Sequence, residues 1–142
     1  MRPPAEQIVN GAGDAIVFAD AEGTIRLWNA AAERMFGYPA AEAVGASLDL
    51  IVPEKHRARH WEGYARVMRT GQTKYGGDLL AVPAVRRDGS RISIEFTVTL
   101  VRDGDGAVRG IAAIIRDVTA RRDAETQLRR RVQELEQGSA GA

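Results

Sequence analysis

The chain has 142 residues and a net charge of +1, and 44% of its residues are hydrophobic and 27% charged. These values are typical of one soluble globular domain and exclude a disordered tail, and the charge gives no indication of nucleic acid or an acidic membrane as a partner. The sequence has no cysteine, which excludes disulfides, thiolate zinc sites and iron–sulfur clusters. Because no apolar run could span a membrane and no secretion signal begins the chain, we expect a cytoplasmic protein.

The first elements are predicted to be a hairpin and a short helix. Residues 15–19 are apolar and lead into turn residues, and residues 24–28 alternate between apolar and polar, as a half-buried strand does. Together they predict an antiparallel hairpin. Asn29 is a good N-cap for an alanine-rich helix over residues 30–36, which Gly37 ends.

The middle of the chain is predicted to be helical. A second small helical turn is expected over residues 39–46. Pro53 suits the first turn of a longer helix over about residues 54–68, which Gly71 ends.

The pattern then changes to strands. We predict strands over residues 75–85, 91–100 and 108–118, joined by turns at 87–90 and 103–106. The middle strand alternates clearly, and its even-numbered apolar residues share one face: Ile92, Ile94, Phe96, Val98 and Leu100. The expected fold is therefore α+β, with a single antiparallel sheet flanked by short helices.

Residues 119–137 are charged and predicted to form a helix, followed by a flexible tail over residues 138–142. Leu128, Val132 and Leu135 follow at spacings of four and three, which gives a seam too short to be a stable coiled coil alone. One interpretation is a solvated helix that packs on its own domain. We favour the other, in which it begins a two-stranded signalling helix.

The layout and several local strings resemble the PAS family of sensory domains over about residues 5–120. The strings that carry the resemblance lie at residues 19–25, 28–33, 36–38, 44–45, 87–90 and 116–119. The resemblance implies a five-stranded antiparallel sheet whose helices flank a pocket, and a signal that passes beyond Asp117-Val118-Thr119 into an output helix. It divides the chain into a cap (1–14), a sensor domain (15–118) and the C-terminal helix.

From Pro53 to Gly89 the sequence is most similar to the haem-binding PAS domains of the FixL oxygen-sensor type. The similarity implies that His60 is the axial ligand to the iron of a b-type haem. Residues near the propionates would be Arg66 and Lys74. The resemblance places Tyr75, Leu80, Phe96 and Val98 on the distal wall of the cofactor pocket. Leu79 is a further candidate for the apolar slot that a haem needs.

Two positions depart from these haem sensors. Leu80 stands where that family has an arginine that hydrogen-bonds bound oxygen, and Asp78 stands where a related haem phosphodiesterase sensor has an axial methionine. A polar donor normally stabilises the partly anionic dioxygen. We therefore expect weak discrimination in favour of oxygen, with carbon monoxide or nitric oxide needing the donor less. Tyr75 is a candidate substitute donor.

Other readings of the same residues remain open. His56 and His60 lie four apart, a spacing that two metal ligands on one helix face would have, but no third ligand is evident. Trp61, Tyr64 and Tyr75 are candidates for stacking on a flavin (FAD or FMN), although aromatic residues at helical spacing usually pack in a core. No arrangement typical of a catalytic site is present, so we do not expect an enzyme.

The sequence therefore predicts a sensor of a diatomic gas (oxygen, carbon monoxide or nitric oxide) or of redox state, acting through haem. The alternative is a cofactor-free PAS domain for dimerisation and protein interaction. The expected partners are the gas, a second copy bound through residues 4–12 and the C-terminal helix, and a downstream kinase or other output domain. Neither nucleic acid nor a membrane is expected.

Overall fold

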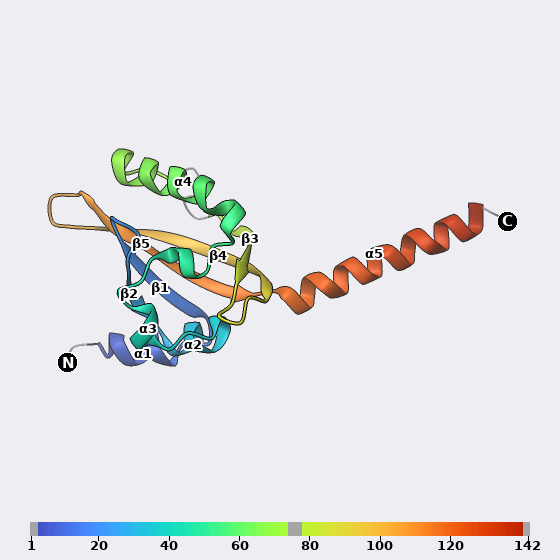
Figure 1. The fold of residues 1–142 in the computed structure, drawn as a ribbon, viewed down its shortest axis with the longest axis horizontal. Helices are drawn as coiled ribbons and strands as arrows, with labels where there is room; N and C mark the ends of the chain where they lie inside the picture. The colour runs from blue at the N-terminus through green and yellow to red at the C-terminus, as the bar shows by residue number, and fades with distance from the viewer. Residues whose placement is uncertain (1–2, 74–77, 141–142) are drawn as a thin grey trace.

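The computed structural model describes residues 3–73 and 78–140. At its centre is a five-stranded antiparallel sheet in the order β2-β1-β5-β4-β3 (Figure 1). The strands are β1 (Ala15–Asp20), β2 (Ile25–Trp28), β3 (Leu80–Val85), β4 (Arg91–Arg102) and β5 (Val108–Asp117). The expected α+β fold and the hairpin of β1 and β2 are confirmed.

Helices connect and cover these strands. They are α1 (Ala5–Gly11), α2 (Ala30–Phe36), α3 (Ala40–Ala43), α4 (Arg57–Thr70) and α5 (Thr119–Ala140), with 3₁₀ turns η1 (Leu48–Leu50) and η2 (Glu54–His56). The helix predicted over 54–68 is thus a 3₁₀ turn followed by α4. Helix α1 was not predicted because its short sequence carries no apolar periodicity. In the structure none of its residues is buried.

The core lies between the sheet and the helices α2 and α3. The alternation predicted for β4 is confirmed, since Ile92 and Ile94 are buried and Phe96 packs against the same cluster. Phe36 of α2 and Ile25 of β2 belong to the same cluster and are fully buried. These apolar side chains give the domain its main stabilisation through the area that they remove from water.

Asn29 joins the N-terminal segment to this core. Its Oδ1 accepts hydrogen bonds from the backbone nitrogens of Ile16 (2.9 Å) and Ala32 (3.0 Å), so it caps α2 as predicted. Its Nδ2 donates to the carbonyl oxygens of Val9 (2.8 Å) and Asp14 (3.1 Å). The side chain is only 1% exposed, so all its bonds lie within the protein.

The two outer strands of the sheet differ in how their free sides are covered. Beside β2, Ile25 exchanges backbone hydrogen bonds with the segment that follows α3, donating to Ala46 and accepting from Gly45. The other outer strand, β3, contains Pro83, which lies opposite Ser93 of β4. The backbone nitrogen and oxygen of Ser93 bond instead to the start of α5 and to Val118.

Helix α5 begins at the end of β5 and extends away from the sheet (Figure 1). Its first turn is attached to β4, because the Thr119 hydroxyl accepts from the Ser93 nitrogen (2.9 Å) and Arg121 bonds Glu95. The seam residues Leu128, Val132 and Leu135 are 65%, 46% and 66% exposed, so the helix does not pack on its own domain. Within the described residues no helix has the length and apolar character needed to cross a membrane.

Candidate functional site

The predicted ligand, His60, lies on α4, which is fastened at its N-terminal end to the segment around η1. The Arg57 guanidinium donates to the carbonyl oxygens of Val52 (3.1 Å) and Asp49 (3.3 Å). The Trp61 indole nitrogen donates to the Asp49 carboxylate at 2.8 Å. These contacts fix the helix at Arg57, about one turn before His60, and at Trp61, the residue that follows it.

Trp61 also lies directly against the turn between β1 and β2. A Cβ atom added at Gly23 would be 2.1 Å from the Trp61 ring, which is far inside van der Waals contact. Gly23 has φ +80°, a conformation that other residues rarely adopt. Glycine is therefore required here for two reasons, the backbone conformation and the close approach of α4.

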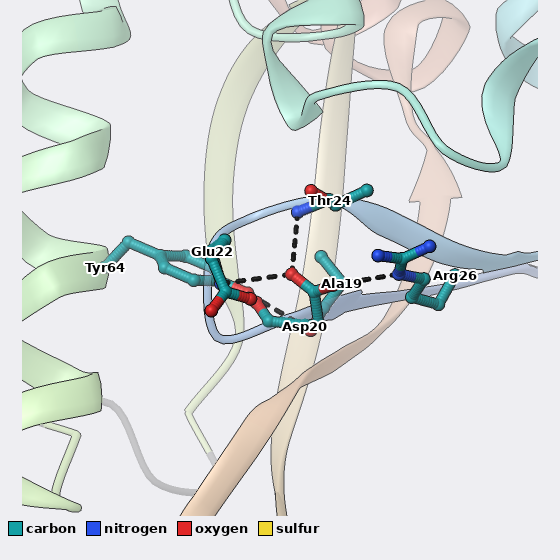
Figure 2. A network of polar contacts seen from close by, with 6 residues as sticks. All are labelled: Ala19, Asp20, Glu22, Thr24, Arg26 and Tyr64. Carbon is teal, nitrogen blue, oxygen red and sulfur yellow. Dashed lines mark hydrogen bonds and ion pairs between the residues drawn. The ribbon is translucent and has the colours of Figure 1, made fainter.

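Tyr64 makes the second contact with the same turn. Its hydroxyl donates to the carbonyl oxygens of Asp20 (2.5 Å) and Ala19 (3.1 Å), as Figure 2 shows. Burial raises the pKa of Tyr64, and the charges of Asp20 and Glu22 raise it further. The phenol therefore stays protonated and remains a donor at every physiological pH.

The turn that receives Tyr64 is held by Asp20. Its carboxylate accepts from the backbone nitrogens of Glu22 and Thr24 at 3.0 Å and from the Arg26 guanidinium at 2.8 Å (Figure 2). Burial alone would raise the pKa of Asp20, but these hydrogen bonds and the charge of Arg26 together lower it. Asp20 is thus the fixed acceptor that shapes the turn on which α4 rests.

The far end of α4 is attached to the β4–β5 turn, which lies at the same end of the sheet as the β1–β2 turn, because Asp20 pairs with Gly110 and Gly110 with Val101. Gly71 ends the helix with φ +68°, and its carbonyl oxygen accepts from the Arg102 guanidinium at 2.6 Å. Arg102 also donates to the carbonyl oxygen of Gly106, in the β4–β5 turn. Helix α4 is therefore tied at both of its ends, with His60 between the two attachments.

His60 lies on the same face of α4 as the buried Tyr64, four residues later. Its ring contacts those of Trp61 and Tyr64, with centroids 4.7 Å and 5.8 Å apart. The side chain is half-buried, and its Nδ1 is buried without a hydrogen-bond partner among the described residues. Burial lowers the pKa of His60, with the charge of Asp49 acting in the opposite direction. The structure therefore favours a neutral imidazole with an unused nitrogen.

The residues predicted for the pocket wall lie on β3, on β4 and just before β3. Leu80 pairs directly with Phe96 across the two strands, and Val98 follows on the same face of β4. All three are half-buried. Leu79, by contrast, is 62% exposed, so Leu80, Phe96 and Val98 are the residues that the structure brings together.

Of the two residues predicted to lie near the propionates, only Arg66 lies within the part of the chain that the structure describes. Arg66 is exposed on α4 and pairs with Glu62 at 3.5 Å. Lys74 and Tyr75 lie outside the described residues. His56 belongs to η2 and is half-buried, and no group of three or more potential metal ligands occurs in the described part of the chain.

Sequence reasoning did not find the docking of α4. Trp61 and Tyr64 were considered as flavin-stacking residues, but their polar atoms are committed to Asp49 and to the β1–β2 turn. The available signal was a glycine in a turn followed, far along the chain, by aromatic residues spaced three apart. Such a pattern does not say which turn the aromatic rings meet.

Comparison with known proteins identifies the family. The family model described as the PAS fold matches residues 5–118. The chain belongs to the PAS family. A PAS domain of a protein from Colwellia psychrerythraea has a similar structure, with a TM-score of 0.71, 21% identity, and 82% of this chain and 95% of that one covered.

Two curated relatives are named as sensors. The sensor protein FixL of Bradyrhizobium diazoefficiens is 29% identical over 122 residues, which is 86% of this chain and 24% of FixL. The oxygen sensor protein DosP of Escherichia coli is 27% identical over 127 residues, or 89% of this chain and 15% of DosP. The chain thus spans a quarter or less of either relative, and it is a PAS sensor domain of signal transduction.

Proposed function

We propose that this PAS domain binds a b-type haem with His60 as the axial ligand to iron. The observation that carries the proposal is the half-buried imidazole on the inner face of α4, whose Nδ1 is buried and has no hydrogen-bond partner among the described residues. A buried polar atom without a partner is uncommon in proteins and calls for an explanation. A neutral imidazole is also the state that binds a metal.

The neighbouring residues fit such a group. Leu80, Phe96 and Val98 offer half-buried apolar side chains to a flat, apolar cofactor. Val82, on the same face of β3 as Leu80, is 41% exposed although it pairs with the buried Ile94. This part of the sheet therefore has apolar surface that its own side chains leave uncovered.

When bound, haem supplies an iron that takes up a diatomic gas or changes its oxidation state. The chain's own residues then do three things in this proposal. His60 holds the group, Leu80 and Phe96 exclude water, and the attachments of Trp61 and Tyr64 keep α4 in place. Because position 80 is leucine, the pocket lacks one polar donor for oxygen, and we propose weak preference for oxygen over carbon monoxide or nitric oxide.

We further propose that the signal leaves through β4. Phe96 and Val98 lie on the inner face of this strand, and Ser93 and Glu95 of the same strand hold the first turn of α5. A shift of β4 would therefore change the direction of α5. FixL and DosP are much longer than this chain, which supports a kinase or other output domain as the partner.

Absorption spectroscopy of the purified protein after haem addition tests the proposal. We expect a Soret band at one haem per chain, lost in His60→Ala and retained in His56→Ala, which removes the other histidine of the chain. Circular dichroism must show that both variants stay folded. A folded protein that remains colourless with excess haem, or a band that survives His60→Ala unchanged, contradicts the proposal.

A second candidate is a cofactor-free PAS domain for dimerisation and protein interaction. It is favoured by the exposed seam of α5, where Leu128 and Leu135 are 65% and 66% exposed. The colourless outcome above supports this candidate. A flavin is less well served, because Trp61 and Tyr64 are already engaged in docking α4.

A further inference from the structure

The guanidinium group of Arg102 joins two parts of the molecule that are far apart in the chain. One of its terminal nitrogens donates to the carbonyl oxygen of Gly71, which ends α4, at 2.6 Å, and the other donates to that of Gly106, in the β4–β5 turn, at 3.0 Å. Both acceptors are backbone atoms, so the planar donor group sets the distance between the helix and the turn. The positive charge also suits the end of a helix, where the carbonyl oxygens carry a partial negative charge.

The end of α4 lies directly against the strand pair that carries Arg102. A register shift follows Val101, so that Arg102 of β4 pairs with Val108 of β5. A Cβ atom added at Gly71 would lie 3.4 Å from Nη1 of Arg102 and 3.8 Å from Cγ2 of Val108, which is close to ordinary van der Waals contact. Arg102 and Val98 are an even number of residues apart on β4, so Arg102 shares the face of the strand that carries the predicted pocket wall.

The second half of α4 has little buried apolar surface of its own. Within α4, which the structure describes throughout, only Tyr64 is buried. After it, Val67 and Met68 are half-buried and the remaining residues up to Thr70 are exposed. Segments with few buried apolar contacts open at low free energy. The attachment through Arg102 is therefore an important part of what keeps this half of the helix in place.

We propose that Arg102 is a positioning residue that keeps the second half of α4 closed over β4 and so controls how fast a group beneath the helix is exchanged. For haem the inference rests on the proposed function, in which the group lies between His60 of α4 and the side chains of Phe96 and Val98 on β4. The closure itself is a property of the polypeptide and is measurable without haem.

His60 is held by contacts other than those of Arg102. Trp61 donates to Asp49, and Tyr64 donates to the carbonyl oxygen of Asp20. Both anchors lie within one helical turn of His60, whereas Gly71 lies about three turns further along α4. Loss of Arg102 should therefore release the far end of the helix and leave the imidazole where it is.

Amide hydrogen exchange of the protein without haem tests the closure. Arg102→Ala removes two hydrogen bonds, so we expect about tenfold faster exchange over residues 67–71 and unchanged exchange over residues 57–62. Arg102→Lys keeps the charge but loses the fork that reaches both carbonyl oxygens, and its exchange should be intermediate. Arg109→Ala is the matched control, because Arg109 is exposed on β5 of the same hairpin and its side chain makes no hydrogen bond or ion pair among the described residues.

Two results of this experiment overturn the inference. Equal exchange over residues 67–71 in Arg102→Ala and Arg109→Ala means that the bonds of Arg102 do not hold the helix. Faster exchange throughout the chain in Arg102→Ala means a general loss of stability instead of a local opening. Circular dichroism shows whether each variant is folded as the unchanged protein is.

The rate of haem loss gives the functional test. Transfer of haem to excess apomyoglobin should be about tenfold faster from Arg102→Ala than from the unchanged protein or Arg109→Ala, because the helix opens more often. The Soret band should keep its wavelength, since His60 stays in place. A shifted band means that Arg102 acts on His60 itself, and equal rates of loss mean that it does not control exchange; either result overturns the inference and leaves haem binding intact. With a colourless protein the proposed function fails, and amide exchange alone then decides on the closure.

Discussion

Replacing Gly23 with alanine tests whether α4 rests against the β1–β2 turn. Two costs add at this position. The backbone has φ +80°, a left-handed conformation that costs a residue with a Cβ about 1–2 kcal/mol. The added methyl group would also lie 2.1 Å from the Trp61 ring, and overpacking of this kind costs about 1–3 kcal/mol. We therefore expect Gly23→Ala to lower the free energy of unfolding by about 2–5 kcal/mol.

The chain provides a matched control at Gly89. This glycine has a similar φ of +87°, but an added Cβ would meet no heavy atom within 4 Å. Gly89→Ala should therefore show the backbone cost alone, about 1–2 kcal/mol. Unfolding in urea, followed by circular dichroism, gives both values, and their difference isolates the contact with Trp61.

A double-mutant cycle completes the test. In a Trp61→Ala background the ring is gone, so Gly23→Ala should cost no more than Gly89→Ala. Should Gly23→Ala cost the same with and without Trp61, the ring would not lie against the turn, and the reasoning on the position of α4 and His60 would fail with it.

Two further predictions concern the polar groups that hold the domain together. Asn29→Ala leaves the carbonyls of Val9 and Asp14 and the nitrogens of Ile16 and Ala32 without their partner. The substitution should lower the free energy of unfolding in urea by about 3 kcal/mol or more. A loss below about 1 kcal/mol would contradict the bonds described. Because the folded pKa of Asp20 lies below its ordinary value of 3.8, the stability it contributes is complete above that value and is lost as the pH falls through and below it. The difference in unfolding free energy between the unchanged protein and Asp20→Asn should therefore shrink from about pH 6 to pH 3, and a constant difference would count against this role.

The parts of the fold that follow from local pattern were predictable. Period-two alternation located β4, the sequence around Asn29 and Gly37 gave the bounds of α2, and Pro53 and Gly71 lie close to the ends of the η2 and α4 segment. Each of these signals is contained within a few residues, and the local preference agrees with the final structure.

The docking of α4 was not predictable in the same way. The contact between Gly23 and Trp61 and the bond from Tyr64 to Asp20 join residues that are far apart in the chain. The family resemblance singled out His60, whose side chain is half-buried in the structure. It could not show that one ring nitrogen is buried without a partner, because that depends on what every neighbouring segment presents.

The two borders of the sheet have a consequence for how copies of this protein meet. The backbone of Ser93 is turned away from Pro83, so the amide position of Pro83 faces outward, where proline has no hydrogen to donate. The opposite border, at Ile25, is already occupied by Gly45 and Ala46. Neither border is a good template for a foreign strand, so the edges of the sheet protect the domain against β-aggregation.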